Sequence, residues 1–219
     1  MRTGWATVAG VCVLALADTA FVVTPVVADT PPMAVQSDAA ALIRAAEGQV
    51  GVTTVYDPAY VSLTFPGGDV AAERGVCTDV VIRALRVAHG IDLQAAVNAD
   101  MKAHFADYPA LWGLTRTDRN IDHRRVPNLQ RLFARMGAEL ALSTAPEAFQ
   151  PGDIVTSMLP GNLPHVMIVS DRVAGGGRLM VVHNIGAGAR IEDMLFAYPL
   201  TGHYRLTPEV LARLKALQG

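Results

Sequence analysis

The sequence is short of charge, of cysteine and of long apolar runs, and each shortage excludes a class of protein. Only 17% of its 219 residues are charged and the formal net charge is −2. A nucleic-acid-binding protein carries a strongly basic patch, so this class is excluded. Hydrophobic residues reach 51%, a share that excludes a largely disordered chain. The length suits one substantial core, and we expect a single domain.

No apolar run near the N-terminus reaches the roughly 20 residues that a membrane span requires. Residues 5–17 are apolar and follow the positive Arg2, and small residues end the segment at Ala28. This pattern is typical of a secretory signal. We therefore predict that residues 1–28 are a cleaved signal, with Ala17 as a second possible cleavage site. An uncleaved membrane anchor is the competing interpretation.

Cysteine occurs twice, as Cys12 and Cys77. Cleavage removes Cys12, so the exported chain keeps one thiol. A lone cysteine in an oxidising compartment is a buried small side chain, a partner in an intermolecular disulfide or a reactive nucleophile. We expect a flexible leader over residues 29–36 and one domain over residues 37–219. The expected location is periplasmic or secreted, with no stable membrane insertion after cleavage.

Helix signals fill the first part of this domain and strand signals fill the second. Capping residues, Gly stops and apolar spacing predict helices over residues 38–47, 77–90, 92–106, 127–137 and from 207 onward. Short β-branched runs between Gly or Pro turns predict strands over residues 153–158, 165–170, 178–183 and 203–206. The order predicts an α+β fold, with N-terminal helices packed on a C-terminal antiparallel sheet.

Two of the predicted strands each carry a histidine, His165 and His183. If residues 171–177 form the hairpin loop, the two imidazoles lie directly opposite each other, with Cβ atoms about 4.5–5.5 Å apart. Met167 shares the face of His165, and we expect this apolar face to pack against the helices. A helix on that face would bring Cys77 within reach of both histidines.

This arrangement suits nucleophilic catalysis by a thiol. A thiol has a pKa of about 8.5 and reacts as the thiolate, which a helix N-terminus stabilises. A neighbouring histidine takes the proton, and a further polar group holds that histidine in the required tautomer. We predict Cys77 as the nucleophile, His165 as the base and His183 as the orienting residue. Asn184 is the alternative orienting residue, and no cofactor is implied.

The order of these motifs resembles that of the NlpC-type, papain-like cysteine hydrolases. The motifs are Gly75-Val76-Cys77-Thr78-Asp79, then Pro-Gly-Asp-Ile-Val, His165-Val-Met-Ile-Val and Val-Val-His183. More closely, the sequence resembles the bacterial domain-of-unknown-function family 1287 over roughly residues 45–206. The matching stretches are residues 74–83, 120–129, 151–155, 183–186 and 201–205. The superfamily resemblance implies a papain-like core and cleavage of amide bonds in peptidoglycan peptides.

The same resemblance implies a tyrosine beside the active site, for which Tyr56 and Tyr60 are both candidates. The irregular segment from Asn120 to Arg125 is an addition to the minimal superfamily pattern. Its candidate substrate-binding residues are Asp122, His123, Arg124 and Arg125. An arginine pair suits a peptide carboxylate, which guanidinium binds in a two-pronged fashion. The alternative is a solvated loop anchored by salt bridges.

Two other classes of function compete with the thiol hydrolase. A zinc hydrolase would use Asp122, His123, His165 and His183 as ligands. The sequence has no His-Glu-x-x-His helix or close histidine pair, and we predict no metal site. A non-catalytic module that binds the cell wall or a protein partner would keep the fold without the reaction. Replacing Cys77 separates the last class, because binding would survive and turnover would not.

Overall fold

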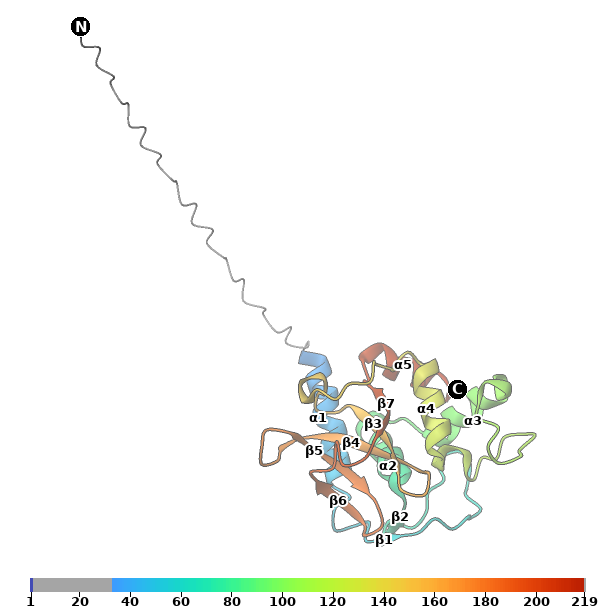
Figure 1. Cartoon of the computed structure of the whole chain (residues 1–219). Coiled ribbons are helices and arrows are strands. Elements are labelled where there is room, and N and C mark those ends of the chain that lie inside the picture. The colour runs from blue at the N-terminus through green and yellow to red at the C-terminus, as the bar shows by residue number, and fades with distance from the viewer. Residues whose placement is uncertain (2–32, 219) are drawn as a thin grey trace. The chain divides into compact units, whose positions relative to one another are not determined.

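Helices precede strands along the part of the chain that the structure, a computed structural model, describes: Met1 and residues 33–218. The helices are α1 (Met33–Glu47), α2 (Cys77–His89), α3 (Leu93–Ala103), α4 (Val126–Arg135) and, after the strands, α5 (Pro208–Ala216). Figure 1 shows the N-terminal helices packed beside the sheet, the α+β arrangement predicted from the sequence. Residues 2–28 of the predicted signal and residues 29–32 of the predicted leader lie outside the described residues. Residues 33–36 belong to α1.

The main sheet has five antiparallel strands in the order β6-β5-β4-β3-β7. Its strands are β3 (Ile154–Leu159), β4 (Leu163–Val173), β5 (Leu179–Asn184), β6 (Ala189–Glu192) and β7 (Leu200–Tyr204). The edge strand β6 was not predicted. A separate two-stranded parallel pair, β1 (Val55–Tyr56) with β2 (Arg74–Gly75), leads the chain into α2. No helix within residues 33–218 is long and apolar enough to cross a bilayer.

α2 is the helix that matters for the site, and its ends follow from local chemistry. The carboxylate of Asp79 accepts a 2.7 Å hydrogen bond from the backbone N–H of Val76, which satisfies a donor at the helix start. Gly90 ends the helix with a φ of 64°, a left-handed conformation that favours glycine. Between these ends Val81 and Leu85 are completely buried. The predicted helix over residues 77–90 is confirmed.

The two faces of the sheet are covered by different parts of the chain. Val166, Ile168 and Val182 pack with the residues of α2 in the larger core. Met167 and Val181 pack on the opposite face in a second, smaller core. The expectation that the face of Met167 meets the helices is therefore wrong. β4 carries apolar residues on both faces, so alternation along the strand could not identify the helical side.

The register of β4 and β5 also differs from the predicted one. Ile168 pairs with Val182 and Val169 with Val181, a shift of two residues from the predicted pairing. β4 continues to Val173 through a register irregularity, and the turn between the strands closes over residues 174–178. The two imidazoles therefore lie on one face as diagonal neighbours and not directly opposite each other.

Candidate active site

The sheet opens where α2 begins. The last paired residues of β4 and β5 on this side are Ile168 and Val182. β4 begins at Leu163 and β5 continues to Asn184, so both strands extend beyond the last pair. The N–H of Val169 donates to the carbonyl of Asp153, on the β3 side. N–H groups of an antiparallel strand point alternately to its two neighbours, so the N–H of Val166 faces the gap toward β5.

The sulfur of Cys77 fills this gap. Cys77 is the first residue of α2 and is 6% exposed. The backbone N–H groups of Val166, Thr78 and Cys77 itself point at Sγ. Cys77 itself packs in the larger core on the helical face of the sheet. His165, the residue before Val166, shares the opposite face with Met167, because side chains alternate along a strand.

Asn184 holds the end of β5 against the segment that leads into α2. Its Nδ2 donates a 3.0 Å hydrogen bond to the carbonyl of Gly75, and its Oδ1 accepts from the N–H of Gly186. Neither bond reaches an imidazole. Asn184 therefore positions the backbone before Cys77. Among the described residues it makes no hydrogen bond to His165, the contact that its alternative role as the orienting residue requires.

His165 and His183 are joined to each other and to a carboxylate. His165 Nε2 lies 2.8 Å from His183 Nδ1, and His183 Nε2 lies 2.9 Å from an oxygen of Glu192. Both imidazoles are buried, with His183 completely so. Sequence reasoning missed Glu192, because it lies at the end of the unpredicted strand β6. The described residues contain no hydrogen bond between Sγ of Cys77 and an imidazole.

This chain of hydrogen bonds fixes the tautomers of both histidines. The carboxylate of Glu192 only accepts, so Nε2 of His183 carries a hydrogen. Nδ1 of His183 is then an acceptor, and Nε2 of His165 must donate to it. The lone pair of His165 is left on Nδ1. That atom has no hydrogen-bond partner among the described residues.

Burial keeps the thiol and the imidazole uncharged in this state. Burial raises the pKa of the Cys77 thiol to about 11, and the backbone N–H groups that point at Sγ only partly offset it. Burial also lowers the pKa of His165 to about 3, and the charge of His183 adds to the decrease. Both shifts favour a neutral thiol and a neutral imidazole at neutral pH.

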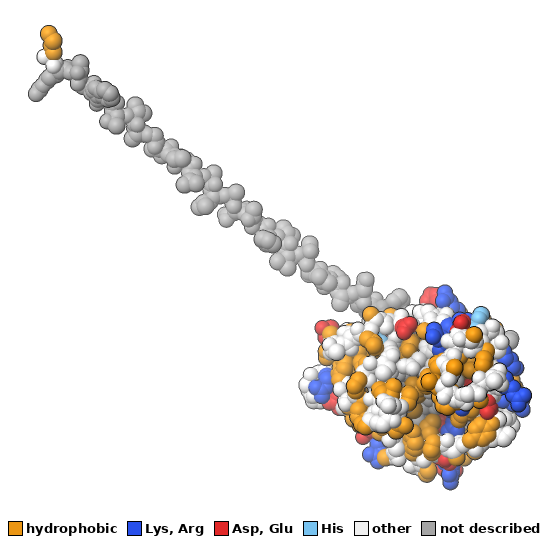
Figure 2. Space-filling model, turned by 45° about the vertical axis from the view of Figure 1, so that its right-hand side comes forward, with side chains coloured by type: hydrophobic (Ala, Val, Ile, Leu, Met, Phe, Trp, Pro, Cys, Tyr) orange, Lys and Arg blue, Asp and Glu red, His pale blue; other side chains and the backbone are white. Residues whose placement is uncertain are grey.

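Cys77 borders a groove of about 380 Å³. The side chains around it are Tyr56, Pro58, Val76, Cys77, Trp112, Ile121, Arg124, Arg125, Val126, Pro127, Leu163 and Pro164. On the face shown in Figure 2, hydrophobic side chains cover much of the surface and charged side chains lie mostly toward the rim.

The structure separates the two candidate tyrosines. Tyr56 borders the groove, and its pKa is raised first by burial and then by its proximity to Cys77 and Asp79. Tyr60 lies outside the groove lining. Its hydroxyl donates to Asp118 at 3.1 Å and accepts from Asn120 at 2.9 Å, which ties two loops together. Tyr56 is thus the tyrosine beside the thiol.

Arg124 is committed to an internal ion pair. Its Nε and Nη2 donate to the two oxygens of Asp79, both at 2.9 Å, and the pair is almost fully buried. Nη1 donates to the carbonyl of Ala59 at 3.2 Å. This clamp joins the start of α2 to the 3₁₀ helix η2 (Asp122–Arg124), and the structure gives Arg124 no free edge for a ligand.

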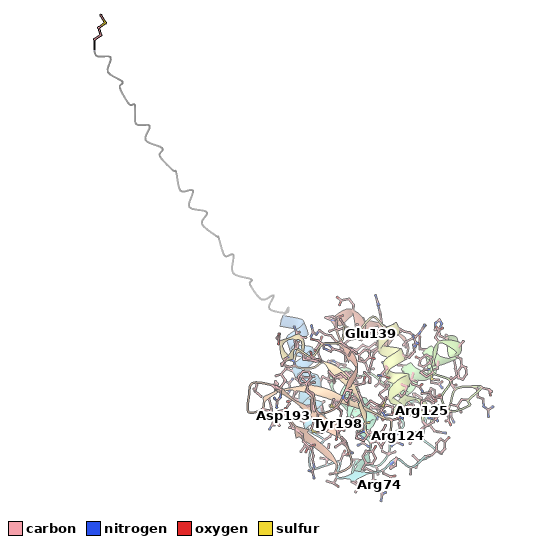
Figure 3. The ribbon with its side chains drawn as sticks, in the orientation of Figure 1. Arg74, Arg124, Arg125, Glu139, Asp193 and Tyr198 are labelled. Atoms are coloured by element: carbon pink, nitrogen blue, oxygen red, sulfur yellow. The ribbon has the colours of Figure 1, made fainter. Side chains whose placement is uncertain are left out.

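The neighbours of Arg124 have different surroundings. Arg125 borders the groove, whereas Asp122 and His123 are buried away from its lining. Asp122 accepts from Nη1 of Arg125 at 3.1 Å. Burial lowers the pKa of His123 to about 4, and its Nδ1 has no partner among the described residues. Figure 3 places Arg124 and Arg125 together near one end of α4.

The described part of the chain contains no set of ligands that fits the zinc hypothesis. Within residues 33–218, no three His, Cys, Asp or Glu side chains are grouped so that they could hold a metal ion. The described geometry instead offers a thiol, a hydrogen-bonded pair of imidazoles and a carboxylate.

Comparison with known proteins identifies the family but no activity. A family model described as a domain of unknown function, DUF1287, matches residues 43–206. The uncharacterized protein YijF of Escherichia coli strain K12 is 52% identical over 178 residues, which cover 80% of this chain and 86% of that protein. The chain therefore belongs to the DUF1287 family.

Proposed function

We propose that this protein is an exported cysteine hydrolase with a papain-like core, which cleaves an amide bond in peptidoglycan peptides. The observation that carries the proposal is the position of Cys77 at the gap between β4 and β5, where the backbone N–H of Val166, the residue after His165, points at its sulfur. The hydrogen-bonded series from His165 through His183 to Glu192 supports it, because this series leaves Nδ1 of His165 unprotonated. Export to the periplasm or the exterior is part of the proposal and rests on the signal-like residues 1–28.

The proposed reaction has two stages. The sulfur of Cys77 attacks the amide carbonyl carbon while its proton passes to Nδ1 of His165. The C–N bond then breaks, and the imidazolium of His165 returns the proton to the leaving amine. Water hydrolyses the resulting thioester by the reverse proton route, which releases the acid and restores the thiol.

The neutral resting pair determines when the proton moves. Since burial favours the thiol and the neutral imidazole, transfer is expected during attack and not before it. His183 and Glu192 stabilise the imidazolium that forms, because the carboxylate is hydrogen bonded to His183. The backbone N–H of Cys77, at the start of α2, is suited to stabilise the developing oxyanion.

A digestion of purified peptidoglycan tests the reaction. We expect the full chain to release new amino groups, and Cys77→Ala to release about 100-fold less or none. Cys12→Ser is the matched control, because it removes the other cysteine and leaves the proposed nucleophile in place. Equal product from the wild-type and Cys77→Ala forms would contradict the mechanism.

The neutral, buried thiol also favours a second candidate function, a non-catalytic module that binds the cell wall. The same samples decide between the two candidates. Sedimentation with insoluble peptidoglycan that is equal for both forms, without release of amino groups by either, supports the binding module.

A further inference from the structure

Two adjacent arginines border the groove, and their guanidinium groups are used differently. Arg124 presents its Nε and Nη2 edge to Asp79, which accepts on both oxygens. Among the described residues, the side chain of Arg125 makes one hydrogen bond, from Nη1 to Asp122 at 3.1 Å. Sequence reasoning could not separate these two residues, because each is an arginine in the same irregular segment.

Within residues 33–218, the Nε and Nη2 edge of Arg125 has no hydrogen-bond partner. Neither nitrogen is a fully buried atom that lacks a partner. The side chain of Arg125 is 17% exposed and borders the groove that contains Cys77. This edge carries two parallel N–H donors, the geometry that matches the two oxygens of a carboxylate.

Two contacts hold that edge in place. The guanidinium carbon of Arg125 lies 4.0 Å from the centre of the Trp112 ring, and the ring also borders the groove. Asp122 holds Nη1 on the opposite side and is itself 1% exposed. Stacking fixes the plane of the guanidinium and the ion pair fixes its rotation, so little side-chain entropy is lost when a ligand binds.

We propose that Arg125 is a carboxylate-binding residue of this groove, and that the substrate is a peptide amide with a free carboxylate near the bond that is cleaved. This inference deepens the proposed function. It rests on that function in one respect, because the ligand is a substrate only if the protein is a hydrolase. The free edge of Arg125 binds both carboxylate oxygens, and Trp112 supports the pair from one side. Arg124 contributes no ligand contact, because Asp79 occupies its corresponding edge.

Fluorescence of Trp112 tests binding without requiring turnover. The chain has two tryptophans, so the full chain with Trp5→Phe reports on Trp112 alone. Cys77→Ala is added to remove any reaction. We expect N-acetylglutamate to change the fluorescence in a saturable way, and the corresponding diamide, which has no carboxylate, to have no effect.

Substitutions of Arg125 test the assigned edge. Arg125→Gln should weaken N-acetylglutamate binding about tenfold or more, and Arg125→Lys should also weaken it because an ammonium lacks the two-pronged edge. Arg131→Gln is the matched control, since it removes an exposed arginine from α4, outside the groove lining. Circular dichroism shows whether each variant is folded. If Arg125→Gln does not fold, Arg125→Lys still tests the assigned edge.

The outcomes separate this inference from the proposed reaction. Equal responses to the acid and the diamide, no response to either, or unchanged binding in folded Arg125→Gln and Arg125→Lys would overturn the carboxylate site. Arginine-dependent binding of the acid without Cys77-dependent peptidoglycan cleavage supports the site and rejects the hydrolase. Peptidoglycan cleavage that depends on Cys77, together with no preference of the groove for N-acetylglutamate over its diamide, rejects the carboxylate site and leaves the hydrolase in place.

Discussion

Glu192 affects His165 at a distance of two hydrogen bonds. It makes no contact with His165 that the structure records, yet its bond to His183 decides which nitrogen of His165 carries a proton. Burial lowers the pKa of His183, and the hydrogen bond and negative charge of Glu192 offset part of that decrease. Glu192 is therefore a positioning residue in the proposed mechanism.

Replacing this carboxylate should slow the reaction and move its pH dependence. We expect Glu192→Gln to lower kcat by about 10- to 100-fold, because the imidazolium formed during attack loses its carboxylate. The acidic limb of the rate profile should shift to lower pH, since removal of a nearby negative charge lowers the pKa of the imidazoles. Steady-state kinetics across the pH range measure both effects.

Asp193→Asn is the control for Glu192→Gln. Asp193 is the next residue and pairs with Arg178 at the surface. Its removal should leave the pH profile unchanged. If Glu192→Gln alters the rate without moving the acidic limb, Glu192 has only a structural role.

Among the elements, the start of α2 depends on one buried ion pair. Asp79 caps the helix through Val76 and binds Arg124, which also donates to the loop carbonyls of Asp57 and Ala59. Both side chains of the pair are 3% exposed or less. The position of Cys77, two residues before Asp79, therefore depends on η2 and on the loop before β2.

Breaking this pair should be costly, because it leaves a buried charge without a partner. We expect Arg124→Met to lower the free energy of unfolding by about 3–5 kcal/mol. Urea denaturation measures the loss, and the double variant Asp79→Asn with Arg124→Met should recover part of it. The exposed pair of Arg74 and Asp57 is the control, and Arg74→Met should cost less than about 1 kcal/mol. Equal losses at the two sites would show that the buried pair has no special role.

Elements with strong local signals were predictable from the sequence, and those set by distant contacts were not. Gly90 and Asp92 mark helix ends through backbone conformation and capping, which neighbouring residues determine. The strand β6 has four residues, too few for a clear alternation, so Glu192 was missed. The face that the helices cover was also unpredictable, because both faces of β4 are apolar.

The contact between the imidazoles of His165 and His183 was predicted although the predicted strand register was wrong. The register differs by two residues from the predicted one, and a shift of two keeps side chains on the same face. A shift of one would have separated the imidazoles. The roles of Arg124 and Arg125 could not be distinguished in advance, because only the folded position of Asp79 decides which guanidinium group it binds.

Over the whole molecule, buried neutral imidazoles make stability depend on pH. Burial lowers the pKa of His123 to about 4 and that of His165 to about 3. In the unfolded chain these groups bind protons near pH 6.5, whereas the folded chain excludes them until the pH is much lower. The stability that they provide is complete above about pH 7 and is lost as the pH falls through the window below about 6.5.

We expect the free energy of unfolding to fall by about 1.4 kcal/mol per pH unit for each of these imidazoles between about pH 6 and pH 4.5. Urea denaturation at a series of pH values measures this slope. His123→Gln should reduce the slope, and His104→Gln, which replaces an exposed histidine, should not. A stability that is constant down to about pH 5 would contradict the assignment of buried neutral histidines.

The gap in the sheet makes the assembled site a reporter of complete folding. Cys77 belongs to the layer of helices. By strand register, His165, His183 and Glu192 share the opposite face of the sheet with Met167 and Val181 of the second core. A collapsed chain with only one layer in place would contain either the thiol or the imidazoles in native surroundings, but not both. Recovery of Cys77-dependent turnover during refolding would therefore mark the last docking step, which helix content alone would not detect.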